Sequence, residues 1–371
     1  MNAAVSDHYS KGFWQLAWQR FATDRVGIVS LVVVALFFIV VFLSATGLVA
    51  SNWNEEVAIN DAPPNFWGLI TPPPSTTSDY SASIETNAEH DGLPLSTVDP
   101  LAEDIARLQN QTPVSSVVDP LADVLASLTT QGKTATAHEE KASSLPLGGD
   151  RWGRDVLMKT IKGTQTSLFV GLTAALLATF LGTLFGAFAG YYGGYTDDAL
   201  NWVYSVLNAI PYLLLILAVA AVLQKRGVTT VVLILGLTGW TGVFRLIRAE
   251  YIKHRSREYV MAARAFGVPS WRILFIHILP NVSHIVLVEI SLLTVAFIKS
   301  EVILSFLGFG VAVDEVSWGS MLNDAQSELI LGRWWELAAA GGAMAILVTA
   351  ISLLTDAMRD ALDPKIKRKL A

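Results

Sequence analysis

The sequence predicts an all-α polytopic membrane protein with six transmembrane helices, and three observations lead to this class. Hydrophobic residues fill 52% of the 371 positions, whereas charged residues fill only 16%. The mean hydropathy is +0.47, which is too high for a soluble domain of ordinary composition. Several apolar runs approach or exceed the roughly 20 residues that a helix needs to cross a bilayer.

Six apolar segments are the predicted spans, and they cover about residues 26–50, 166–189, 200–223, 229–244, 282–304 and 334–355. The leader and the apolar core of the first segment are both too long for a cleaved signal peptide, so we expect a retained anchor at 26–50. Residues 1–25 place an aromatic face on one side of a helix, which predicts a cytoplasmic helix at the membrane interface. A short soluble helix packed on the loops is the alternative.

Residues 51–150 form a predicted external insert between the first two spans. They hold fifteen Asp and Glu against three Lys and Arg, a net charge of −12, and ten of the fourteen prolines. Since the whole chain is at −6, the remainder is at +6. The pentapeptide at 98–102 recurs at 118–122, which indicates either two short helices on linkers or a disordered spacer.

The loop at 245–281 carries seven Lys and Arg against two Glu, and so basic a loop is expected in the cytoplasm. With the N-terminus also inside, six spans place the loops at 51–165, 224–228 and 305–333 outside. The basic tail, 357–371, then lies inside. The permease core is expected over residues 151–356. Six basic residues on the outer side depart from the charge rule, namely Arg151, Arg154, Lys159, Lys162, Lys225 and Arg226. We expect residues 148–162 to lie on the outer surface.

Within the basic loop, residues 258–266 contain good helix formers, and Gly267 is a natural helix end. Pro269 blocks continuation, after which Ser270 can cap a second helix that ends at Pro280. Two helices around a glycine, lying between two membrane spans, predict an element that docks into another protein. A basic interfacial loop without a partner is the alternative.

Small residues recur at every fourth position of the second span, at Ala174, Ala178, Gly182, Gly186 and Gly190. Such a stripe lets another helix approach closely, within the chain or on a partner. Asn208 and Pro211 interrupt the third span, where proline kinks a helix. Glu301, at the end of the fifth span, is either part of a translocation path or gate, because charges there are costly, or an outer-end residue that anchors a loop.

The residues Ala262, Ala263 and Gly267, followed by Ile278-Leu279-Pro280, resemble the EAA loop of ABC importer permeases. Met261 stands where that pattern has glutamate, so an ionic contact there is not expected. In that family this loop is the coupling helix that docks into the ATPase. The resemblance implies the same contact for Glu258, Tyr259, Met261, Ala262, Ala263, Arg264, Phe266 and Gly267.

Further motifs resemble the C-type permeases of dipeptide and oligopeptide importers. They are GRDVL at 153–157, GYYGG at 190–194, Ile210-Pro211, SFLGFG at 305–310 after Glu301, and the acidic and basic tail pattern at 356–364. The resemblance covers about residues 13–50 and 147–366 and does not extend to the insert. It implies an importer permease, most commonly for peptides, in a bacterial or archaeal plasma (inner) membrane with both termini cytoplasmic.

The sequence contains no phosphate-binding loop of the form GxxxxGK followed by Ser or Thr, so we expect no ATP site and no enzymatic activity on this chain. It has no cysteine for a thiolate metal site and no metal-ligand spacing among its histidines. The implied partners are a second homologous permease, two ATPase subunits that bind ATP and Mg, an external substrate-binding protein and membrane lipid, with no nucleic acid. Alternatives are a nickel, sugar or opine importer, a secondary transporter, or a membrane scaffold that presents the insert.

Overall fold

The regular structure is helical, apart from isolated β-bridges, in the residues that the computed structural model describes: 18–65, 141–312 and 314–362. The chain divides into two units, and the helical one consists of residues 1–65 and 143–371. Its helices are α2 (Arg25–Ala45), α5 (Val156–Tyr192), α6 (Gly194–Asn208), α7 (Tyr212–Leu223), α8 (Val228–Thr238), α9 (Thr241–Arg255), α10 (Glu258–Ala265), α11 (Ser270–Arg272), a π-helical turn (Ile273–Ile278), α12 (Leu279–Phe306), α13 (Trp318–Ile330) and α14 (Trp335–Leu362).

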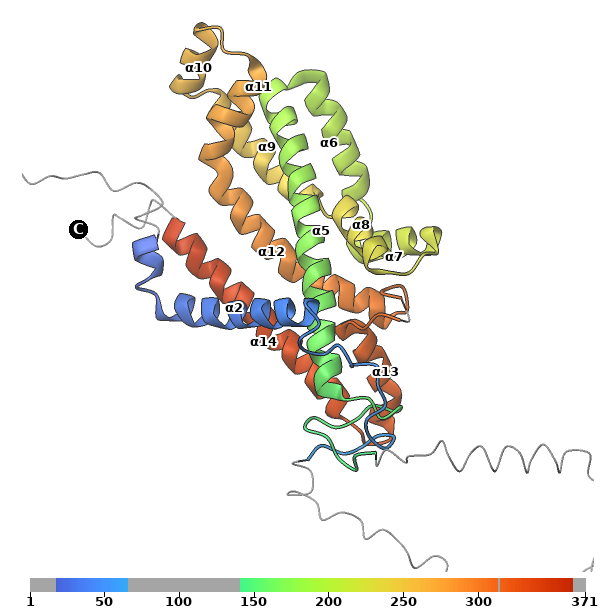
Figure 1. Ribbon diagram of the computed structural model, residues 1–371. Coiled ribbons are helices and arrows are strands. Elements are labelled where there is room, and N and C mark those ends of the chain that lie inside the picture. Colours follow the sequence, from blue (N-terminus) through green and yellow to red (C-terminus); the bar gives the residue numbers. More distant parts are fainter. Residues whose placement is uncertain (1–17, 66–140, 313, 363–371) are drawn as a thin grey trace, which may run out of the picture. The chain divides into compact units, whose positions relative to one another are not determined.

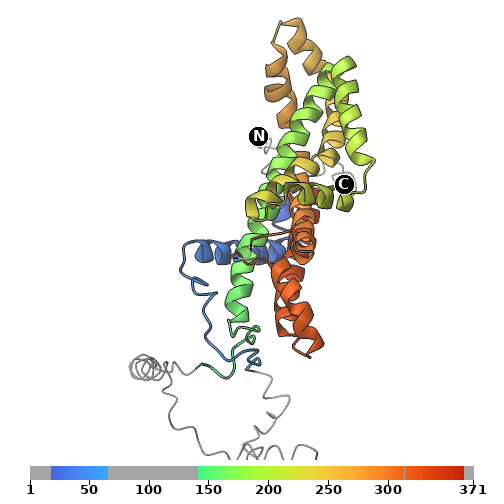
Figure 2. The ribbon, with the colours of Figure 1, turned by 90° about the vertical axis from the view of Figure 1, so that its right-hand side faces the viewer.

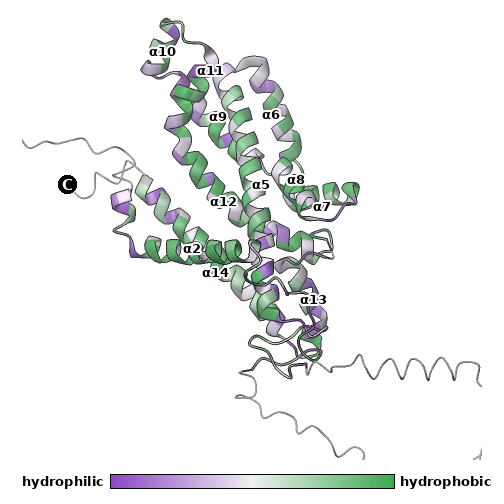
Figure 3. Ribbon diagram, in the orientation of Figure 1, coloured by the Kyte–Doolittle hydropathy of each residue, from purple (hydrophilic) through white to green (hydrophobic). Residues whose placement is uncertain are grey.

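Five helical segments of this described part are long and apolar enough to cross a membrane: Arg25–Ala45, Val156–Tyr192, Val228–Arg255, Ser270–Phe306 and Trp335–Ala361. The pair α6 and α7 makes a sixth if it counts as one span. The predicted class, an all-α polytopic membrane protein, is therefore confirmed. The apolar surface faces outward. Helix α2 is strongly apolar, but only 17% of its most hydrophobic 18-residue stretch is buried within the protein. Figure 3 shows α2 hydrophobic along its length.

Helix α5 lies at the centre of this unit and packs against α9, α12 and α8, whereas α2 packs mainly against α14 (Figures 1 and 2). In both views α10 and α11 lie at one end, and α13 lies at the other. The apolar core around α5 contains Val170, Ala174, Leu235, Trp240, Phe244 and Phe297. The helices thus form a connected body, with α10 at one end and α13 at the other.

Helix α5 begins earlier than the predicted second span, and the prediction of a surface segment over 148–162 is wrong for its second half. The helix begins at Val156, where the Asp155 carboxylate accepts a hydrogen bond from the Leu157 N–H at 2.8 Å. Lys159 is buried in the second turn. Hydropathy counts such a lysine as a surface residue, but here its charge is matched by acidic groups distant in the sequence.

The predicted second helix of the basic loop is also different, because it does not end at Pro280. Helix α11 continues through the π-helical turn into α12. In that turn the hydrogen bonds widen by one residue, so that the Leu279 N–H pairs with the Leu274 carbonyl. Pro280 follows this turn as the second residue of α12, and the helix continues through it. The loop helix and the fifth span are one continuous run.

The third predicted span is broken rather than kinked. Helices α6 and α7 meet at an angle of 89°. At the base of the insert, residues 51–65 and 143–155 belong to the helical unit and pair through isolated bridges, among them Glu56 with Arg154. Phe21 packs against Ala357 and Ala361 of α14. Most of the predicted helix at 1–25, the repeat at 98–102 and 118–122, and the tail from 363 lie outside the described residues.

Candidate functional site

Helix α10 ends in a tight glycine turn at one end of the molecule. Gly267 has φ of +72°, a conformation that glycine adopts without strain. The Val268 N–H pairs with the Ala263 carbonyl at 3.0 Å, and the Gly267 N–H pairs with the Arg264 carbonyl at 2.9 Å. These two bonds are the pair of a Schellman motif, which closes a helix and fixes the direction of the chain after it.

This turn presents large apolar side chains outward. Phe266 is 87% exposed, Met261 is 52% exposed and Tyr259 is 38% exposed. Glu258 and Ala262 are exposed too. Isolated exposed apolar residues are normal on a protein surface, but several large ones on one eight-residue helix and its cap mark an interaction surface. The side chain of Met261 is therefore available for apolar contact.

The opposite face of α10 holds the helix on the body of the protein. Val260 is fully buried in a cluster with Tyr251, Ile273 and Leu274, and Ala263 packs at its edge. Arg264 places its guanidinium 4.7 Å from the centre of the Tyr191 ring at the end of α5. An apolar face turned inward and another turned outward make α10 a rigid projection rather than a loose loop.

Tyr259 adds a polar contact to the same element. Its hydroxyl lies 2.8 Å from Nδ1 of His254 at the end of α9. Partial burial raises the pKa of Tyr259, which opposes the effect of the nearby Arg257 charge. The phenol stays neutral at physiological pH, and it ties the start of α10 to the helix before it.

The stripe of small residues on α5 faces α9 within the chain. A Cβ on Gly182 would lie 2.6 Å from the Val243 Cβ, and one on Gly186 would lie 2.9 Å from the Phe244 carbonyl oxygen. A Cβ on Gly190 would lie 2.6 Å from the Arg248 carbonyl oxygen. Ala174 and Ala178 continue the buried stripe. The two helices therefore touch backbone to backbone, which ties the α10 end to the centre of the body.

Asn208 and Pro211 lie together at the break between α6 and α7. Asn208 is the last residue of α6 and Pro211 is the N-cap of α7. Both are exposed, and α6 buries none of its residues within this chain. The break therefore opens a surface of this chain rather than an internal site.

Glu301 is fully buried at the end of α12. Its carboxylate accepts hydrogen bonds from the Ser167 hydroxyl at 2.8 Å and the Ser305 hydroxyl at 2.7 Å. The Ser305 oxygen in turn accepts from the Val311 N–H and the Ser317 hydroxyl, both at 3.4 Å. Glu301 thus joins α5, α12 and the loop before α13, an arrangement that suits the anchoring of that loop.

Sequence reasoning missed a buried ionic cluster at the α13 end. The Lys159 ammonium lies 2.7 Å from Glu336, 3.0 Å from Asp150 and 3.4 Å from Asp324. Glu328, also buried, accepts the backbone N–H of Arg151 at 3.1 Å. The only local indication of this cluster was the position of Lys159 near the capped start of α5. Its partners lie up to 177 residues away in the chain.

Comparisons with known proteins agree with this architecture. Residues 182–368 match the family described as the binding-protein-dependent transport system inner membrane component, and residues 12–64 match the N-terminal transmembrane domain of oligopeptide transport permease C. The dipeptide transport system permease protein DppC of Bacillus subtilis is 35% identical over 231 residues, which are 61% of this chain and 72% of that protein. The oligopeptide transport system permease protein OppC of Mycobacterium tuberculosis is 36% identical over 219 residues, 59% of this chain and 75% of that protein.

The chain belongs to the family of inner membrane components of binding-protein-dependent transport systems. Within that family it is a permease of the C type, the group whose relatives are named for dipeptide and oligopeptide transport. Its members are membrane permease subunits rather than enzymes. The predicted membership of the C-type peptide permease family is confirmed.

Proposed function

We propose that this chain forms half of the translocation path of an ATP-driven peptide importer and that α10 docks into its ATPase. The support for the docking role is the two-faced geometry of α10. Its inner face is fixed by the buried Val260, while Phe266 and Met261 project outward with 87% and 52% exposure. Apolar side chains on a rigid support are the usual anchors of a protein interface, since little conformational entropy is lost when they are covered.

The remaining partners follow from the proposed role. A second permease chain would complete the path, two ATPase subunits would supply ATP and Mg, and an external binding protein would deliver cargo at the α13 end. In this arrangement the α6–α7 break with Asn208 and Pro211 borders the path, and Glu301 shapes its outer gate by holding the loop before α13. Peptide cargo is supported by the names of the relatives; no observation favours nickel, sugar or opine cargo.

The test is recovery of the ATPase subunits with the affinity-purified permease. Phe266→Ser removes an anchor that contacts little in this chain, so the variant should fold and reach the membrane but recover markedly less ATPase. Ile330→Ser is the matched control, because Ile330 has the same 87% exposure but lies at the other end, on α13. Equal recovery with Phe266→Ser and wild type would refute docking by α10.

A further inference from the structure

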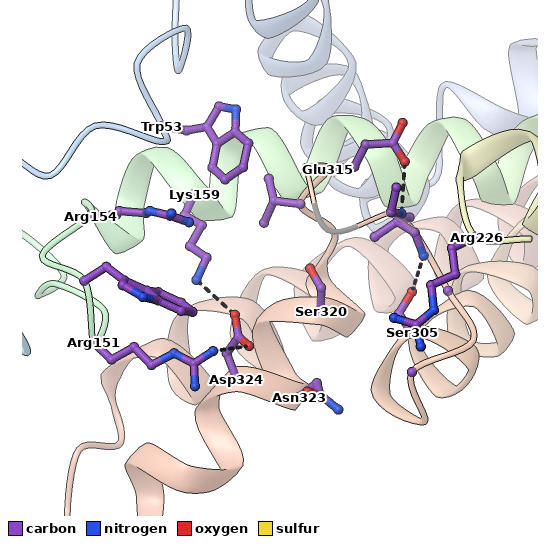
Figure 4. Close-up of a pocket in the computed structure, with 16 residues that line it drawn as sticks. Trp53, Arg151, Arg154, Lys159, Arg226, Ser305, Glu315, Ser320, Asn323 and Asp324 are labelled. Atoms are coloured by element: carbon purple, nitrogen blue, oxygen red, sulfur yellow. Dashed lines mark hydrogen bonds and ion pairs between the residues drawn. The ribbon is translucent and has the colours of Figure 1, made fainter.

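Basic residues that depart from the positive-inside rule gather around one cavity near the α13 end. The cavity has a volume of about 320 Å³. It is lined by Arg151 and Arg154 from the segment before α5, by Lys159 near the start of α5 and by Arg226 from the α7–α8 loop (Figure 4). Sequence reasoning placed these residues on the outer side without a reason for their charge. Their convergence on one space supplies that reason.

The acidic residues of the cavity wall are already engaged. Glu315 accepts the Val228 and Ala312 N–H groups at 3.3 and 3.4 Å. Asp324 pairs with Lys159 and Arg151, each at 3.4 Å. The lining residues thus include four cations and two carboxylates, and Lys159 is further matched by Asp150 and Glu336 behind the wall. Arg154 and Arg226 are the lining cations that have no acidic partner among the residues that the structure describes.

Arg154 is held by two aromatic rings, and its guanidinium has an N–H donor without an acceptor in the described part of the chain. Its guanidinium lies 4.9 Å from the centre of the Trp152 ring and 5.9 Å from that of Trp53. Its Nε is buried, with no hydrogen-bond acceptor in the described part of the chain. Aromatic rings can hold a guanidinium by its face while they leave its edge free for a planar anion. Arg154 is therefore positioned but not neutralised.

Arg226 is positioned by its backbone neighbours. The Gly227 N–H pairs with the Gly310 carbonyl at 3.2 Å, and the Val228 N–H pairs with Glu315 at 3.3 Å. These bonds fasten the short α7–α8 loop to the loop between α12 and α13. The wall that carries Arg226 is thus fixed relative to the rest of the cavity, and Figure 4 shows Arg226 beside Ser305 on the side away from Arg154.

We propose that this cavity binds the terminal carboxylate of a peptide through Arg154, with Trp53 and Trp152 beside the adjoining side chain, while Arg226 on the opposite side attracts the anion by its charge. Guanidinium groups match a carboxylate in charge and in planar geometry. Every unmodified peptide carries this group whatever its sequence, so the site would accept peptides without reading their side chains. The inference rests on the proposed import of peptides only for the source of the carboxylate.

The direct test is binding of trialanine and of trialanine amide to the assembled complex without its external binding protein. Saturation-transfer magnetic resonance detects weak binding of such small probes. Arg154→Gln should raise the Kd for trialanine about tenfold, as the loss of one charge-assisted hydrogen bond predicts, and Arg226→Gln should raise it by a smaller factor, because that exposed charge acts from across the cavity. The amide should bind weakly to every variant. Equal binding of acid and amide, or an unchanged Kd in both variants, would overturn the proposal.

Lys225→Gln is the matched control, because Lys225 is exposed beside Arg226 but does not line the cavity; it should bind trialanine like wild type. Arg226 is itself exposed, so its variant should fold even if that of Arg154 does not.

Docking of the external binding protein, with and without trialanine, identifies the source of the carboxylate. Peptide-free docking should be unchanged in both variants; equal weakening with and without peptide would assign the site to a protein carboxylate and overturn the cargo assignment.

The outcome for the cavity is separable from that for the proposed function. Stimulation of ATP hydrolysis by the loaded binding protein in the wild-type complex upholds the importer role whichever way the trialanine experiment turns out. Conversely, the cavity could prove selective for carboxylates in a complex that does not transport peptides. That outcome would support the anion site but refute a peptide as its natural ligand.

Discussion

The ammonium group of Lys159 lies 2.7 Å from a carboxylate oxygen of Glu336, although 177 residues separate the two in the chain. Asp150 is a second buried partner of the lysine at 3.0 Å, and the side chains of both acids are 0% exposed. Lys159 lies near the start of α5, Glu336 at the start of α14, and Asp150 at the returning end of the insert. One buried cation therefore fastens three separate segments at the α13 end.

Removal of that cation should be strongly destabilising. Lys159→Met leaves Asp150 and Glu336 as uncompensated buried charges, and loss of one partner of a buried ion pair typically costs about 3–5 kcal/mol. We expect a lower unfolding temperature of the detergent-solubilised protein. The double variant Lys159→Met, Glu336→Leu should recover part of the loss, since it removes one of the unpaired charges. A double variant less stable than the single would contradict this explanation.

Glu328 makes the stability of the folded protein depend on pH at this same α13 end. Burial raises the pKa of its carboxyl above the ordinary value of 4.5, against lowering effects of Glu336, the Arg151 N–H and Lys159. Asp150 acts in the raising direction. Since the folded state binds this proton more tightly than the unfolded state, this group's contribution to stability is present at low pH and falls as the pH rises from about 4.5 through the raised pKa.

Glu328→Gln should therefore flatten the pH dependence of stability. The amide keeps the shape of the neutral carboxyl but cannot ionise, so the unfolding temperature should decline less on the alkaline side than in wild type. Thermal unfolding in a series of buffers measures this. Asp324→Asn, on the same helix but more exposed, provides the comparison; an identical decline in wild type and Glu328→Gln would show that another group is responsible.

The spans could be predicted from the sequence because apolarity over about twenty residues is a strong local signal. Gly267 could be identified for a similar reason, since a helix end depends on the backbone of a few neighbouring residues. The α5 start was misplaced because a hydropathy scale assigns Lys159 a fixed value, whereas its burial depends on Asp150 and Glu336. The helix end predicted at Pro280 was wrong because the π-helical turn before Pro280 has no recognisable residue pattern.

The remaining features of the site depend on distant residues meeting in space. Arg154 and Arg226 looked like unrelated exceptions to a charge rule, and only the fold brings both to one cavity. Glu301 could be recognised as a costly buried charge, but its role as a loop anchor depends on Ser167, 134 positions away. Such relationships are set by packing and have no local signature.

The contact between α5 and α9 should tolerate no added side chain at Gly182. A Cβ there would already lie 2.6 Å from the Val243 Cβ and 2.7 Å from the Trp240 carbonyl oxygen. Gly182→Leu should lower stability by about 1–3 kcal/mol or more, because both helices must move apart. Gly242→Leu is the control on the facing helix, since nothing lies within 4 Å of its Cβ position. Equal unfolding temperatures for the two variants would contradict this packing.

Substitution of Gly267 should affect coupling through the backbone. Its φ is +72° and nothing lies within 4 Å of its Cβ position, so a side chain would meet strain but no collision. Valine in this conformation costs about 1 kcal/mol or more, whereas asparagine adopts it more readily. Gly267→Val should therefore abolish or strongly reduce substrate-stimulated ATP hydrolysis in the reconstituted complex, and Gly267→Asn should retain most of it. Normal stimulation in Gly267→Val would contradict the role of this turn, and equal defects in both variants would indicate that the docking surface, not the backbone conformation, excludes a side chain.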